Sequence, residues 1–183
     1  VDTVERALFM TDKARGGLGD GRDLGVKVSG PAGKFVNYQV GLFNGSGENQ
    51  NDVDKNDQKA VVGRLTVRLP FVKGLQVGSS AAWGHGQTSD RARRDRYGAE
   101  LLFAQHGFTL KSEFMAIKDA DYHRLGYYTH LGYRLRSKVE AVFRLDAFDP
   151  DTRLETTAAN VAERDYLGGI NYFINGKNLK LRR

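Results

Sequence analysis

The chain has 183 residues and a formal net charge of +6, and 40% of its residues are apolar. No stretch approaches the roughly 18 consecutive apolar residues that a membrane-spanning helix needs. The apolar fraction also argues against a disordered chain, although the mean hydropathy is only −0.51. Cysteine is absent, which excludes disulfides and thiolate chemistry. Alternating strands reconcile these numbers, because every second residue of such a strand is polar.

Ten segments of alternating apolar and polar residues follow one another from Leu24 to the end of the chain. A period of two predicts strands with one apolar face. A length of about ten residues is what a tilted strand needs to cross a bilayer. One representative apolar residue of each segment, in chain order, is Val26, Val40, Leu65, Val77, Leu101, Phe114, Leu131, Phe143, Ile170 and Leu181.

The connections between these segments alternate between short and long. We predict tight turns at residues 31–33, 70–73, 106–107, 136–138 and 175–177. Longer polar loops are predicted at residues 45–57, 86–92, 118–122 and 149–162. Sorting of turns to one end and loops to the other is typical of outer-membrane barrels, whose long loops face the cell exterior. The predicted fold is therefore all-β, a transmembrane antiparallel up-and-down β-barrel with about ten strands present in this chain.

A soluble β-sandwich that binds acidic partners is the alternative from another class. Its strands alternate in the same way, but its apolar face points into the protein. The predicted strands are longer than the usual five or six residues of a soluble sheet. Aromatic residues such as Trp83, Tyr97 and Tyr133 also lie on the apolar face, several of them near strand ends. Aromatic girdles of that kind favour the membrane interpretation.

The polar faces of the predicted strands carry more basic than acidic side chains. Glu100, Glu113, Glu140 and Asp146 are the acidic residues. An excess of Arg and Lys along a pore attracts anions, so we predict an anion pathway along this face. The alternative is a general pore whose charges pair with one another, for example Arg144 with Asp146 or Lys111 with Glu113. The predicted pathway residues are Lys27, Arg64, Arg68, Arg96, Lys111, Arg134, Arg144 and Lys180.

The first 21 residues follow a different pattern from the hairpin meander predicted over residues 22–183. Residues 4–9 predict a short helical turn, and residues 13–21 form a glycine-rich basic stretch. The sequence GGLGDG lacks the Gly-Lys-Ser/Thr that a phosphate-binding P-loop requires. An ordinary surface loop is one interpretation of this stretch, since its glycines supply turns.

Other chemistries find little support. The four histidines share no zinc-ligand spacing, and no serine sits in a nucleophile elbow. Asp52, Asp54 and Asn56 have calcium-loop spacing, but Asp57 and Gly63 occupy the positions that need Gly and Glu. The basic run at residues 91–96 lacks aromatics for base stacking, so we predict no nucleic-acid partner. We accordingly predict no enzymatic activity, catalytic residues, metal or cofactor.

Five segments together resemble the phosphate-selective porin O/P family, in the family's order. They are RDLGVKVSGPAGKFVNYQVGLFNGSG (22–47), NDQKAVVGRLTVRLP (56–70), RRDRYGAELLFA (93–104), VEAVFRLDAFDPDT (139–152) and YLGGINYFIN (166–175). The resemblance implies a sixteen-stranded, commonly trimeric channel of the bacterial outer membrane that passes small anions such as phosphate or polyphosphate. Outer-membrane lipid and lipopolysaccharide would surround it.

The resemblance also has consequences for the first residues and for the extent of the chain. A segment before the first strand narrows the channel in that family, which makes Arg6, Lys13, Arg15 and Arg22 constriction candidates. The sequence departs from the family in having about ten strands and no terminal strand that ends in an aromatic residue. We therefore expect residues 1–183 to be an internal part of such a barrel.

Overall fold

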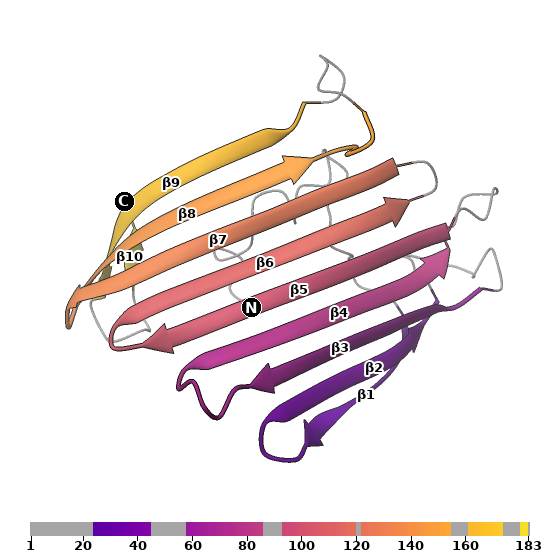
Figure 1. Ribbon diagram of the computed structural model, residues 1–183, viewed down its shortest axis with the longest axis horizontal. Coiled ribbons are helices and arrows are strands. Elements are labelled where there is room, and N and C mark those ends of the chain that lie inside the picture. The colour runs from indigo at the N-terminus through magenta and orange to yellow at the C-terminus, as the bar shows by residue number, and fades with distance from the viewer. Residues whose placement is uncertain are drawn as a thin grey trace.

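The chain folds into one antiparallel sheet in which every strand pairs with its neighbour in the sequence (Figure 1). The computed structural model describes residues 24–44, 58–85, 93–119, 122–154, 161–173 and 180–182. These residues contain ten strands and no helix. The prediction of an all-β, up-and-down antiparallel fold is confirmed. The described strands form a single sheet, so they do not build the two packed sheets of the sandwich alternative.

The strands have the lengths that the alternating pattern predicts, and the last one is short. Their bounds are β1 (Gly25–Ala32), β2 (Val36–Phe43), β3 (Ala60–Arg68), β4 (Leu75–His85), β5 (Arg93–Gln105), β6 (Phe108–Asp119), β7 (Tyr122–Arg136), β8 (Val139–Asp149), β9 (Glu163–Phe173) and β10 (Lys180–Arg182).

The tight turns lie close to their predicted positions. His106 and Gly107 form a two-residue connection with φ of 50° and 80°. Positive φ at both positions matches the right-handed twist of a hairpin. The first turn is shifted from the prediction, because β1 continues through Pro31, which pairs with Asn37. A proline is tolerated on the edge strand of the described sheet, where its missing N–H leaves no neighbour unpaired. The predicted turn at 175–177 lies outside the described residues.

One predicted long loop is wrong. The sequence predicts a loop at 118–122, but only two residues separate the end of β6 from the start of β7. Lys118 pairs with His123, and Asp119 pairs with Tyr122 through the backbone. Lys118 and Asp119 are polar because they lie at the end of a strand, beyond its apolar part. Their backbone groups still pair with β7, so the strand does not stop before them. The predicted loops at 45–57 and 86–92 lie outside the described residues, while β8 and β9 do flank a long connection after Asp149.

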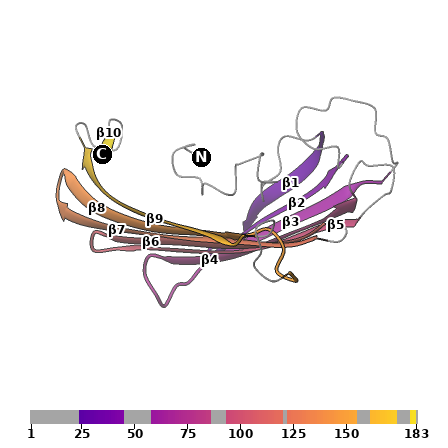
Figure 2. The ribbon, with the colours of Figure 1, turned by 90° about the horizontal axis from the view of Figure 1, so that it is seen from above.

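The two faces of the sheet differ in composition and in exposure. We call the side of Leu65, Phe114 and Phe143 the apolar face, and these residues are 45%, 42% and 45% exposed. The opposite side, the charged face, includes Asp146 at 0% and Asn171 at 4%. Figure 2 shows that the sheet is strongly curved. Side chains converge on the concave side of a curved sheet, so the deeper burial of the charged face places it on that side.

Apolar burial within the described residues is small. The largest apolar cluster consists of Ile117 and Phe148, with Met115 packed against them. Register places all three on the charged face, beside Arg96, Gly98 and Gly126. The broad apolar face on the other side has no covering layer among the described strands. The sheet is therefore not organised around a conventional hydrophobic core.

Candidate functional site

The strand register brings most of the predicted pathway residues onto the charged face. Lys27, Arg64, Arg68, Arg96, Lys111, Arg134 and Arg144 all lie there. Lys180 pairs with Phe173 through the backbone, and its side chain lies outside the described part of the structure. The constriction candidates Arg6, Lys13, Arg15 and Arg22 also lie outside the described residues.

Four further charged residues of this face were missed by the sequence analysis. They are Arg94, Arg124, Glu163 and Asp165, and each pairs with a residue of the charged face. Continuing the alternation to the strand ends would have found them. The described part of the charged face then has nine Arg and Lys side chains against six carboxylates. The four added residues are two basic and two acidic, so they leave the basic excess of the described face unchanged.

Four carboxylates form one row across strands β5 to β9. Glu100 lies directly opposite Glu113, and Asp146 lies directly opposite Asp165. Tyr128 joins the two pairs through its pairing with Glu113 and Asp146. Like charges directly opposite each other destabilise an antiparallel pair. The row therefore needs cations nearby, and arginines provide them at two points.

Arg64 neutralises one end of this row. Its Nη2 donates to both oxygens of Glu100, at 2.6 and 2.7 Å. The pair joins β3 to β5 across β4, next to Gly78. A Cβ at Gly78 would lie 2.7 Å from Cγ of Glu100, so glycine leaves the space that the glutamate fills. The pair is partly open to solvent, since its side chains are 43% and 27% exposed.

Arg144 binds Asp146 of the other pair of carboxylates, and this contact confirms one predicted ion pair. Its Nη2 donates to Oδ1 of Asp146 at 3.0 Å, and its Nε lies 2.8 Å from Oδ2. The guanidinium carbon also lies 5.0 Å from the ring centroid of Tyr128. The two charged side chains are only 13% and 1% exposed. Pairing of Lys111 with Glu113 stays a prediction.

The apolar face carries charge only near the ends of its strands. Asp95, Lys118 and Asp149 lie within three residues of a strand end, at the end of the sheet from which the long connection between β8 and β9 starts. The central parts of the described strands place no charged side chain on this face. Trp83 and Tyr97 lie near the same end and make an edge contact, with Nε1 of Trp83 donating to the Tyr97 hydroxyl at 3.2 Å. An uncharged band with aromatics at its border is therefore present.

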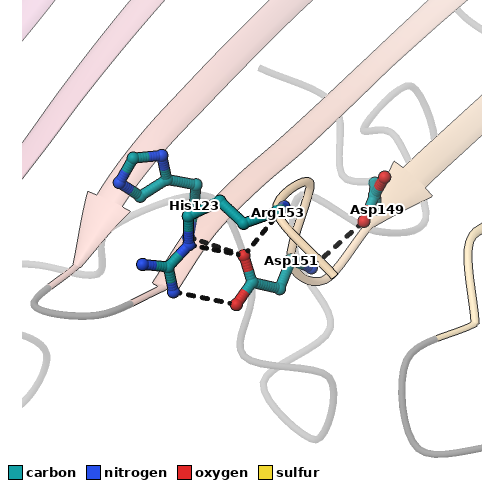
Figure 3. Close-up of polar contacts among 4 residues, drawn as sticks. All are labelled: His123, Asp149, Asp151 and Arg153. Carbon is teal, nitrogen blue, oxygen red and sulfur yellow. Dashed lines mark hydrogen bonds and ion pairs between the residues drawn. The ribbon is translucent and has the colours of Figure 1, made fainter. Parts of the chain in front are cut away.

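The connection after β8 begins with a compact polar turn (Figure 3). Asp151 accepts from Nε and Nη2 of Arg153 at 3.1 and 3.0 Å, and from the backbone N–H of His123 at 3.4 Å. The Thr152 N–H donates to the His123 carbonyl at 2.8 Å. Hydrogen bonds from the Arg153 side chain hold the pKa of Asp151 below its ordinary value. The carboxylate therefore stays charged at neutral pH and anchors this connection to the start of β7.

The described residues contain no group of three or more His, Asp or Glu side chains placed to hold a metal ion. They also contain no helix long and apolar enough to cross a membrane. Comparison of the chain with protein-family models and with curated proteins finds no match.

Proposed function

We propose that this sheet is part of the wall of an outer-membrane β-barrel that lets small ions and polar solutes diffuse passively. The apolar face meets lipid, and the charged face lines a water-filled lumen. One observation carries this proposal. A broad, exposed apolar face with no charge at mid-strand lies directly behind a face rich in arginine and glutamate. Lumen and lipid residues alternate in this way in transmembrane barrels.

The energetics support the same arrangement. Contiguous apolar patches on soluble monomers rarely exceed a few hundred square ångströms, because exposing more of them to water is unfavourable. Lipid removes that cost, provided that every backbone N–H and C=O is paired. The interior strands meet this condition through their ladders. In the described sheet the outer edges of β1 and β10 have no partner strand, so we propose that additional strands of the complete polypeptide pair with them and close the barrel.

Charge pairing favours weak over strong anion selectivity. Arg64 and Arg144 are bound to carboxylates, and both lie at the acidic row. Their charges are largely cancelled for a passing anion. We therefore propose a general channel with a modest anion preference. The resemblance to the phosphate-selective porin O/P family suggests the narrower alternative of phosphate or polyphosphate selectivity, together with a homotrimer in contact with lipopolysaccharide.

Planar-bilayer recording of the complete polypeptide that contains this chain tests the proposal. We expect stepwise conductance and a reversal potential, across a potassium chloride gradient, that indicates an anion preference of a few-fold. A weak preference is expected because exposed lumen charges are screened over about 8 Å at physiological salt.

Two results would contradict parts of this account. Absence of conductance from correctly folded protein would exclude the channel function. Block of the chloride current by micromolar phosphate would replace the general channel with the phosphate-selective alternative. Heat-denatured protein from the same preparation is the control for contaminating pores.

A further inference from the structure

Arg134 contacts an aromatic ring, whereas Arg64 and Arg144 on the same face are bound to carboxylates. Its guanidinium carbon lies 4.7 Å from the ring centroid of Phe173, which comes from β9. The phenylalanine is only 6% exposed, whereas Arg134 is exposed. The guanidinium thus lies over a buried ring, while the arginine itself stays exposed. Stacking of this kind holds the planar group in one orientation.

The carboxylate closest to Arg134 in the strand register is held by another residue. Glu140 lies opposite Arg134, but its Oε2 accepts from Nδ2 of Asn171 at 2.8 Å. Asn171 is 4% exposed, so this acceptor is fixed by a buried amide. Among the described residues, the Arg134 side chain has the ring contact and makes no ion pair. In the part of the chain that the structure describes, its N–H donors are therefore left for a solute.

We infer that Arg134, stacked on Phe173, forms an oxyanion-binding position at the short-turn end of the charged face. A carboxylate or phosphate group of a small solute would accept two parallel hydrogen bonds from the edge of the guanidinium. The inference rests on the proposed function in one respect, because the solute reaches Arg134 through the lumen. It places the anion preference near this end of the sheet instead of at the acidic row.

Arg68 provides a matched comparison within the same face. It ends β3 on the short-turn side, is exposed, and makes no side-chain ion pair among the described residues. No described aromatic ring lies beneath it. Arg68 therefore contributes a similar positive charge without the fixed orientation, and its removal reports the effect of charge alone.

The test measures block of chloride current through the complete polypeptide by acetate or by phosphate added on the short-turn side. Arg134→Gln should raise the half-blocking concentration about tenfold, as expected for loss of hydrogen bonds to a charged group. Phe173→Leu keeps the charge and should raise it about threefold, since the ring contact is lost. Arg68→Gln should change it less than twofold. Block by either anion that depends on Arg134 supports the inference and identifies the preferred group.

Equal effects of Arg134→Gln and Arg68→Gln would overturn the inference, because charge alone would then explain both. Folding of each variant is checked by circular dichroism and by its heat-dependent electrophoretic mobility. Broadening of the phosphorus-31 resonance of phosphate by detergent-folded protein provides a second measurement that needs no conductance. Broadening that depends on Arg134, in protein that passes no current, would contradict the proposed channel function but support the binding position at Arg134. Current without any block or broadening that depends on Arg134 would support the channel function and overturn the binding position.

Discussion

Leu65→Arg is expected to destabilise the protein in lipid by about 2–4 kcal/mol, the cost of an arginine near the bilayer midplane on a barrel's lipid face. Leu65 lies mid-strand on the apolar face and is 45% exposed in the sheet. Thr66→Arg changes the next residue of the same strand and is the matched control. Its side chain belongs to the charged face, between Asn37 and Gly78, so a new charge there meets water.

The free energy of unfolding in urea, measured for protein folded into lipid vesicles, checks this expectation. A soluble sheet predicts a different result, because arginine at an exposed position in water costs little. Equal stabilities of Leu65→Arg and Thr66→Arg would show that the apolar face does not meet lipid. A larger loss for Thr66→Arg would show that the two faces have been assigned in reverse.

Arg144→Ala is expected to cost about 3–5 kcal/mol, because it leaves a buried carboxylate without its cation. Asp146 is fully buried; its Oδ1 accepts a hydrogen bond from Arg144, and its Oδ2 lies 2.8 Å from Nε of Arg144 in an ion pair without a hydrogen bond of its own. Arg64→Ala is the control, since it removes the more exposed pair with Glu100. Solvent-exposed ion pairs contribute at most about 1 kcal/mol, so this loss should be small.

The same urea titration measures both variants, and a double variant separates the causes. Arg144→Ala with Asp146→Ala removes both charges and should recover part of the lost stability. No recovery would indicate that packing of the arginine on Tyr128, and not the unpaired carboxylate, accounts for the loss. A cost for Arg144→Ala no greater than that of Arg64→Ala would contradict the proposed role of burial.

The strands and their two faces were predictable from the sequence because each face repeats with a period of two, and the short connections indicated that consecutive strands are neighbours. The pair Arg144 and Asp146 was predictable for the same reason, since residues two apart in a strand share a face. The contact between Arg64 and Glu100 was not predictable, because it crosses an intervening strand and depends on the register of three strands. The same holds for Arg134 on Phe173, which lie on β7 and β9 with β8 between them.

The error at 118–122 has a related cause. A run of charged residues usually indicates a loop. The end of a strand that extends beyond the apolar band of the sheet also carries polar side chains, so the two cannot be told apart by composition. Lys118 and Asp119 remain in the ladder because their backbone groups still pair with β7. The composition of a segment indicates whether its side chains meet water. The position where a strand ends depends on backbone pairing, which composition does not show.

Leu101 and Leu102 offer the most direct test of the two-faced wall, because they are the same residue type on adjacent positions of β5. Leu101 pairs with Val77 and Ser112 on the apolar face, and Leu102 pairs with Gln76 and Lys111 on the charged face. A nitroxide label at each position, in protein folded into lipid vesicles, reports its surroundings through collisions with oxygen or with a water-soluble nickel complex. We predict that the label at 101 collides mainly with oxygen, which concentrates in lipid, and the label at 102 mainly with nickel. Equal accessibility at the two positions, or the reverse pattern, would contradict the proposal that this sheet separates lipid from water.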